Sequence, residues 1–184
     1  MSLFGGDGRR GVTGEGATDW LPDLLVCDWS RLRESIERAY AVFRRDFCRP
    51  ERRPMFRGKR MGLKRHPLID GREATFWHFV TEGKVEKDRY PVCERIERIA
   101  WPRAMLVEAG RSPSRVLVWS NRRPRRRHGK ATRWVVALED FSYVVIVDER
   151  ESYVLPWTAY PVRERHRRRK LREEYRAWIE RNKG

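Results

Sequence analysis

The chain has no long apolar segment. No run approaches the roughly 20 apolar residues that a transmembrane helix needs, and residues 1–25 lack both the charged region and the apolar region of a signal peptide. We therefore expect no membrane association and predict a cytoplasmic location.

Cysteine and histidine are scarce. The three cysteines, Cys27, Cys48 and Cys93, are odd in number and far apart. They are therefore interpreted as reduced thiols, rather than as a disulfide set or a zinc knuckle. No two histidines stand four residues apart, and no glycine-rich phosphate loop follows a strand. These absences disfavour metal chemistry and nucleotide hydrolysis, so the sequence predicts neither a metal nor another cofactor.

Positive charge and aromatic residues are abundant instead. The 184 residues include 42 Lys and Arg against 26 Asp and Glu, which gives a net charge of +16. Most of the excess is arginine, whose planar fork pairs with phosphate and stacks on bases. Eight Trp and six Tyr can supply both a core and stacking platforms. A nucleic acid is the expected partner.

The first half of the chain is expected to be helical. Residues 1–18 are rich in glycine and are interpreted as a flexible tail before a single domain over residues 19–184. Asp28 is a suitable N-cap for a helix that ends near Phe47. Shorter helices are expected over residues 72–80 and 91–101, with Pro102 ending the second of them.

The apolar period then changes from 3.6 to 2, which is typical of strands. The predicted strands cover residues 106–107, 116–119, 134–138, 143–147 and 153–162. Short polar turns separate the last three, so an antiparallel meander is the simplest connection. A strongly basic helix follows over residues 163–182. The prediction is an α+β fold, with N-terminal helices packed on one face of a roughly four-stranded antiparallel sheet and a basic C-terminal helix.

The last strand carries two hydroxyl groups beside clustered arginines. Thr158 and Tyr160 are two residues apart, so both are expected on one face of the strand, while Trp157 and Ala159 point to the other face, toward the core. Two hydroxyls on one face can hold a phosphate. A half-buried strand with outward polar residues shows the same alternation.

His78, Arg95 and Arg98 are the other candidates for chemistry. His78 lies away from the apolar side of its predicted helix, and its ordinary pKa of about 6.5 suits proton transfer. A structural histidine that binds a neighbouring loop is the alternative. Arg95 and Arg98 are three residues apart and suit a scissile phosphate. Ion pairs with the glutamates next to them are the competing interpretation.

Nine further residues are predicted nucleic-acid contacts because they stand in or beside basic stretches. One stretch precedes the second helix and another connects two strands, where it forms either a disordered loop or a finger laid on nucleic acid. The nine residues are Lys64, Arg65, His66, Arg122, Arg123, Arg125, Arg126, Arg127 and Arg163.

Three blocks of residues, in order, resemble a known family. The first is His66-Pro67, Gly71, Phe76-Trp77-His78 and Glu82-Gly83. The second is Arg95, Arg98 and Trp101-Pro102-Arg103, and the third is Tyr143-Val144-Val145-Ile146 with Thr158-Ala159-Tyr160-Pro161. Together they resemble the phage-associated branch of the barnase–EndoU–colicin–RelE-like (BECR) nucleases, over roughly residues 43–175.

The resemblance implies a metal-independent endoribonuclease, with N-terminal helices on a four-stranded antiparallel sheet and the active site on that sheet. It implies cleavage of RNA by attack of the 2′-OH on the adjacent phosphate, with His78, Arg95, Arg98, Thr158 and Tyr160 as the catalytic candidates. A toxin or phage-type effector with a cognate antitoxin or immunity protein is one biological form. The alternative is a basic nucleic-acid-binding protein without catalysis.

Overall fold

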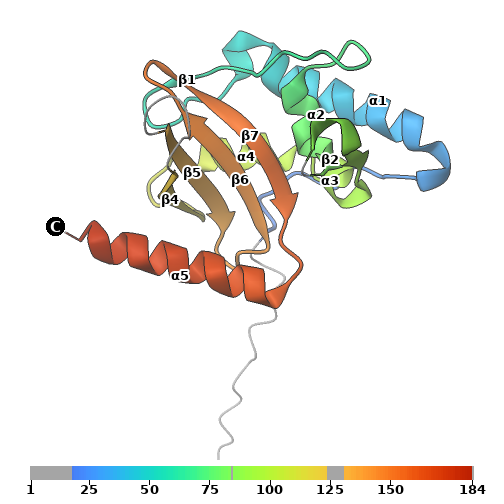
Figure 1. The fold of residues 1–184 in the computed structure, drawn as a ribbon. Helices are drawn as coiled ribbons and strands as arrows, with labels where there is room; N and C mark the ends of the chain where they lie inside the picture. The colour runs from blue at the N-terminus through green and yellow to red at the C-terminus, as the bar shows by residue number, and fades with distance from the viewer. Residues whose placement is uncertain (1–17, 84, 124–130, 184) are drawn as a thin grey trace, which may run out of the picture.

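The computed structural model describes residues 18–83, 85–123 and 131–183 (Figure 1). Except for Thr18, the predicted tail of residues 1–18 lies outside this range. The described chain combines five α-helices with a twisted sheet, which confirms the predicted α+β class.

The main sheet is an antiparallel meander with one short strand added. Its four long strands are β4 (Val116–Arg123), β5 (Ala131–Leu138), β6 (Tyr143–Glu149) and β7 (Tyr153–Pro161). The short β1 (Arg60–Met61) pairs in parallel with the start of β7, so the spatial order is β1-β7-β6-β5-β4. Because β1 covers only Tyr153 and Val154, the second half of β7 forms an edge of the sheet.

The first helix begins and ends close to its predicted limits. The Asp28 carboxylate accepts a 2.8 Å hydrogen bond from the Ser30 backbone N–H at the start of a 3₁₀ turn, η1 (Trp29–Arg31). The helix continues as α1 (Leu32–Phe43) and a π-helical segment, η2 (Arg44–Cys48). Ala39, Phe43 and Phe47 are fully buried and form the apolar side of this helix.

The next segments contain one confirmed helix and two errors. The confirmed helix is α2 (Ala74–Val80). The predicted helix over residues 91–101 divides into α3 (Cys93–Glu97) and α4 (Trp101–Glu108). Pro102 therefore begins a helix instead of ending one, since the first turn needs no backbone N–H. The strand predicted over residues 106–107 is wrong because these residues belong to α4.

Short elements connect the helices. A two-stranded ribbon pairs β2 (Thr81–Glu82) with β3 (Tyr90–Pro91), and the 3₁₀ turns are η3 (Pro50–Arg52) and η4 (Glu86–Asp88).

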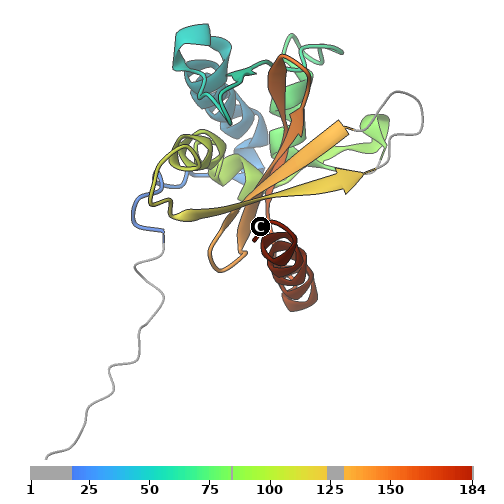
Figure 2. The same ribbon diagram turned by 90° about the vertical axis from the view of Figure 1, so that its left-hand side faces the viewer.

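Two hydrophobic clusters lie on opposite faces of the sheet. Val136, Val145 and Ala159 face the cluster that α1 to α4 cover. Their neighbours Val135, Val144 and Ile146 face a second cluster, covered by Leu171, Tyr175 and Trp178. These last three belong to α5 (Arg165–Arg181), which lies across the sheet from the other helices (Figure 2). Helices α1–α4 therefore cover one face of the sheet and α5 covers the other.

The prediction that all three cysteines are reduced thiols is wrong. Cys27 and Cys93 form a disulfide across 66 residues of sequence, and Cys48 is free. The bond ties the segment before η1 to α3, and the Leu25 N–H adds a 2.8 Å hydrogen bond to the Glu97 carbonyl. Separation in sequence gave no sign of the pairing, because only the packing of the N-terminal segment along α3 brings the two sulfurs together.

Burial raises the pKa of the free Cys48 thiol to about 11, and the nearby Glu73 carboxylate adds to the effect. None of the helices in residues 18–83, 85–123 and 131–183 has the length and apolarity to span a lipid bilayer.

Candidate functional site

A β-bulge reshapes the edge strand where the hydroxyl pair stands. Ile146 pairs with Thr158 and Val147 pairs with Pro156, so Trp157 is an extra residue in β7. A bulge re-aims side chains locally. As a result Trp157 packs against the second cluster, as Tyr160 does, while Ala159 faces the first. The prediction that Trp157 points with Ala159 into the core is wrong for this reason.

A pocket of about 490 Å³ opens at this edge. It is bounded by α2, the β2–β3 ribbon, α3, the second half of β7 and the first turn of α5. Four of the five predicted catalytic residues line it: His78, Arg95, Thr158 and Tyr160. The other six lining residues are not among the predicted site residues: Glu82, Gly83, Arg89, Tyr90, Trp157 and Arg167.

His78 is a buried histidine in the wall of the pocket. Its residue exposure is 4%, and its Nε2 lies 3.1 Å from the Glu86 Oε1. The ring meets Trp157 edge-on, with 5.0 Å between centroids. Burial lowers the pKa of His78, and the Glu86 carboxylate only partly offsets this. The imidazole is therefore neutral at pH 7.

The expectation that His78 stands clear of the core is wrong. All seven residues of α2 are buried. A helix that is enclosed on every side has no solvent face for a histidine to occupy.

Arg95 joins three elements of the pocket through one nitrogen. Its Nη1 donates to the Thr81 carbonyl at 2.8 Å, to the Thr158 Oγ1 at 3.4 Å and to the His78 carbonyl at 3.5 Å. Its guanidinium lies 5.2 Å from the centre of the Tyr160 ring. Burial lowers the pKa of Arg95, but a guanidinium stays charged. Within the described chain its hydrogen bonds all use Nη1, which leaves Nε and Nη2 able to donate to a ligand.

Thr158 is fixed by the same group of contacts. Its hydroxyl donates to the His78 carbonyl at 2.9 Å and accepts from Arg95. The hydroxyl therefore ties the bulged strand to the end of α2.

Arg89 is a pocket residue that the sequence analysis missed. It donates to the Thr81 carbonyl and hydroxyl and to the Gly83 carbonyl, at 2.8 to 2.9 Å. Gly83 has a φ of 148°, and a Cβ there would lie 2.9 Å from the Arg89 Cα. The ribbon therefore needs a glycine against this arginine. No sequence pattern marks Arg89, because its partners are two backbone carbonyls and one hydroxyl of the β2–β3 ribbon and the residue that follows β2.

Arg98 lies outside the pocket, although Arg95 lines it. Because α3 ends at Glu97, Arg98 no longer follows helical spacing. Its Nη1 donates to the Glu94 carbonyl at 3.0 Å and to the Glu97 carboxylate at 3.4 Å. The guanidinium also lies 5.1 Å from the centre of the Trp101 ring. The local ion-pair interpretation describes this arginine.

The predicted nucleic-acid contacts are dispersed. Lys64 Nζ lies 5.2 Å from the centre of the Trp157 ring, beside the pocket. Arg65 and His66 are exposed in the loop before α2, and Arg163 is exposed and paired with Glu94. Outside these four, the remaining predictions lie on or beyond the end of β4. Arg122 and Arg123 are its last two residues, and Arg125, Arg126 and Arg127 lie outside the described residues.

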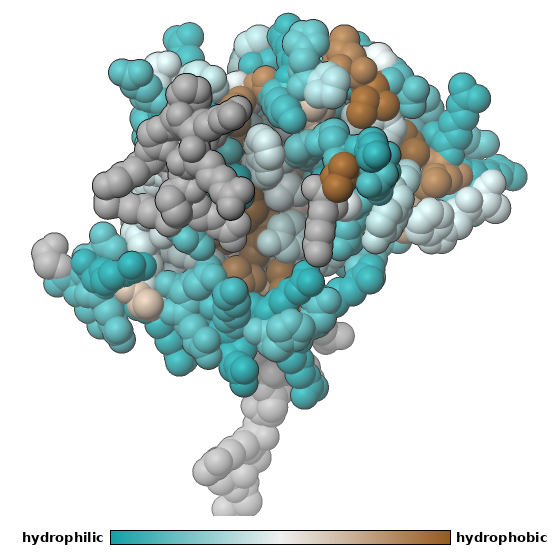
Figure 3. Space-filling view, in the orientation of Figure 1, coloured by the Kyte–Doolittle hydropathy of each residue, from teal (hydrophilic) through white to brown (hydrophobic). Residues whose placement is uncertain are grey.

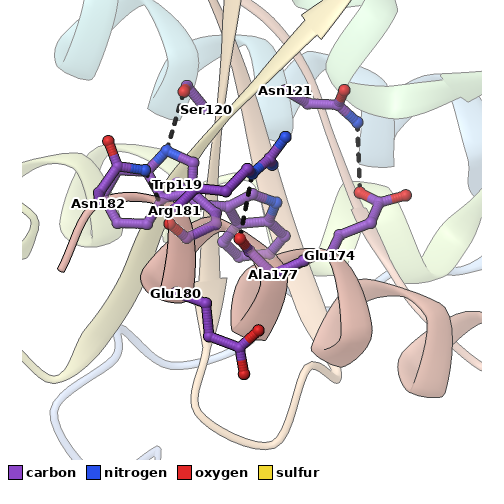
Figure 4. A pocket seen from close by; sticks show the side chains of 9 residues that line it. Trp119, Ser120, Asn121, Glu174, Ala177, Glu180, Arg181 and Asn182 are labelled. Carbon is purple, nitrogen blue, oxygen red and sulfur yellow. Dashed lines mark hydrogen bonds between the residues drawn. The ribbon is translucent and has the colours of Figure 1, made fainter.

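A second hollow of about 850 Å³ lies between β4 and the C-terminal half of α5 (Figure 4). It contains none of the predicted catalytic residues. Two hydrogen bonds cross it: Asn121 Nδ2 donates to the Glu174 carboxylate at 3.3 Å, and Trp178 Nε1 donates to the Ser120 hydroxyl at 3.0 Å. These two hydrogen bonds hold α5 against the sheet.

Fold and site together define an α+β protein with a cationic, aromatic pocket at the edge of its antiparallel sheet. Comparisons of the chain with protein-family models, curated proteins and solved structures found no match. Within the described residues, no group of three His, Cys, Asp or Glu side chains is placed to hold a metal ion.

Proposed function

We propose that the protein is a metal-independent endoribonuclease whose active site is the pocket at the edge of β7. One observation carries the proposal. His78 from α2, Arg95 from α3, and Thr158 and Tyr160 from β7 line the same open pocket. A proton-transfer group, a cation and hydroxyl donors are the parts that metal-free RNA cleavage requires.

The pocket also has the character of a nucleotide site. Arg95 and Arg167 both line it and supply two cations for a phosphate, and the hydrogen bonds of Arg95 within the described chain all use Nη1. Trp157 and Tyr160 present aromatic rings on which a base can stack. The net charge of +16 favours approach of a polyanion.

The proposed reaction assigns a role to each group. The His78–Glu86 pair takes the proton of the 2′-OH, and the 2′-oxygen bonds to the adjacent phosphorus. The bond from phosphorus to the 5′-oxygen breaks, and the Tyr160 hydroxyl protonates that oxygen. Arg95 stabilises the pentacoordinate phosphate, and Thr158 holds the His78 segment in place. The products are a 2′,3′-cyclic phosphate and a 5′-OH.

A second candidate is a nucleic-acid-binding protein without catalysis. The 4% exposure of His78 and the contacts of Arg95 with backbone carbonyls favour it, because both give these residues a structural role. The two candidates share the same partner and differ only in whether RNA is cut.

The deciding experiment is cleavage of labelled RNA in the presence of EDTA. We expect wild-type protein to cleave and His78→Gln to cleave at least about 100-fold more slowly, since general acid–base catalysis contributes that much. The matched control is His166→Gln, which changes an exposed histidine of α5 and should cleave at the wild-type rate. Binding without cleavage by the wild-type protein would establish the second candidate. Equal rates for the two variants would exclude His78 from the reaction.

A further inference from the structure

Four arginines form a line along one side of α5. Arg165, Arg169, Arg172 and Arg176 are spaced four, three and four residues apart, which places them on the same side of a helix. All four are exposed. At 1.5 Å per residue this arginine stripe is about 16 Å long. Figure 3 shows hydrophilic residues gathered over α5.

Contacts on the opposite side of α5 fix the direction in which the stripe faces. Leu171, Tyr175 and Trp178 pack on the second cluster of the sheet. Trp178 and Glu174 also make hydrogen bonds to Ser120 and Asn121 of β4 (Figure 4). Rotation of α5 would break these contacts, so the stripe is a fixed feature of the surface.

The fold itself makes little use of these charges. Arg165 and Arg176 form no hydrogen bond or ion pair with another described residue. Arg169 lies 3.7 Å from the exposed Glu173, and Arg172 lies 5.3 Å from the centre of the Phe141 ring. Like charges at i, i+4 and i, i+3 repel, which weakens an isolated helix. An external polyanion would remove that repulsion.

Arg167 lines the pocket from the first turns of α5. It stands two residues from both Arg165 and Arg169, and residues two apart do not share a side of a helix, so the pocket and the stripe lie on different sides of α5. An RNA strand that leaves the pocket reaches the stripe by passing around the first turn of this helix.

We propose that the arginine stripe of α5 binds the phosphate backbone of RNA outside the pocket, so that the protein takes a substrate of many nucleotides. RNA is favoured over an anionic membrane because a membrane-surface helix needs an exposed apolar face. No large exposed hydrophobic side chain among the described residues belongs to α5. RNA as the bound polyanion rests on the proposed function, whereas binding along the stripe does not require cleavage.

The test compares two triple variants with equal loss of charge. The first is Arg165→Ala/Arg169→Ala/Arg176→Ala, which keeps Arg172 against Phe141. The control is Arg31→Ala/Arg33→Ala/Arg44→Ala, three exposed arginines around α1. Binding is measured by fluorescence anisotropy with 2′-O-methyl RNA, which cannot be cleaved, at lengths of about 4 and about 16 nucleotides and at several salt concentrations.

We expect the α5 variant to bind the longer RNA about tenfold more weakly, with a salt slope lower by about 2, because about 0.7 of slope is lost per phosphate contact on a single strand. Its affinity for the short RNA, and that of the control variant for both, should change less than about twofold. Equal behaviour of the two triple variants would overturn the proposal. A variant that loses binding to phosphatidylserine vesicles but not to RNA would also overturn it.

The outcome is separate from that of the nuclease proposal. Failure of the wild-type protein to cleave natural RNA in EDTA would reject the nuclease and leave the binding comparison intact. Equal binding of the longer RNA by the two triple variants, together with cleavage by the wild-type protein in EDTA, would reject the stripe and leave the nuclease proposal intact.

Discussion

The pocket and the outer side of α5 use the same residue type in opposite ways. In the pocket, Arg89 and Arg95 donate to backbone carbonyls and hold the β2–β3 ribbon, α2 and β7 together. On α5, Arg165 and Arg176 are exposed and have no protein acceptor within the described residues. Burial therefore separates arginines that maintain the fold from arginines that are available to a partner. Substitution of a buried pocket arginine should therefore lower the stability of the fold, whereas substitution of an exposed arginine of α5 should lower binding of a partner.

The largest effect on stability is expected from the disulfide on the pocket side. Cys27→Ser/Cys93→Ser opens a loop that spans 66 residues, and we expect the free energy of unfolding to fall by about 2 to 4 kcal/mol in urea. Cleavage should weaken because α3 carries Arg95, while binding of long RNA along α5 should persist. Mass spectrometry after alkylation in denaturant without reductant should find one alkylated thiol, that of Cys48. Three alkylated thiols in the wild-type protein would contradict the bond.

Two arginines that line the same pocket should differ in how much their substitution lowers the free energy of unfolding. Arg95→Met removes the donor shared by Thr81, Thr158 and His78 and should lower the free energy of unfolding by about 1 to 3 kcal/mol, together with cleavage. Arg167→Met, on the exposed first turn of α5, should cost less than about 1 kcal/mol. Urea denaturation of both variants makes the comparison. Equal losses would show that burial does not distinguish the two sites.

The smallest effect is a dependence of stability on pH. The folded protein holds the pKa of His78 below its ordinary value, while the unfolded chain takes up the proton near pH 6.5. The unfolded state thus binds more protons, and stability should fall as the pH drops from about 6.5 toward the folded pKa of His78. Thermal unfolding between pH 7.5 and 5 measures this, and His78→Gln should flatten the dependence.

The sequence predicted elements well where the apolar period was long. The helix from Asp28 to Phe47 and the meander from β4 to β7 were both predicted, because each presents several turns or strands of one period. Errors arose where a short apolar run was compatible with both a strand and a helix, as at residues 106–107. Pro102 was misread because a proline is compatible with both ends of a helix.

The candidate site was predictable in part for the same reason. Thr158 and Tyr160 were paired by strand alternation, and both line the pocket. Trp157 was misplaced because a single inserted residue shifts the alternation, and the register with β6 that creates the bulge is not visible in β7 alone. Arg98 was misplaced because α3 ends one residue before it.

The amino-acid order alone specifies the abundance of arginine, the change of apolar period from helix to strand, and the spacing that aligns four arginines on one helix. These are properties of neighbouring residues. The packing of distant segments places α5 on the face opposite α1–α4 and brings Cys27 to Cys93. It also brings Arg95 to Thr158 across 63 residues and Thr158 to His78 across 80. Contacts at such separations depend on how all the apolar faces pack at once, because local periodicity specifies which side of an element is apolar but not which element will cover it.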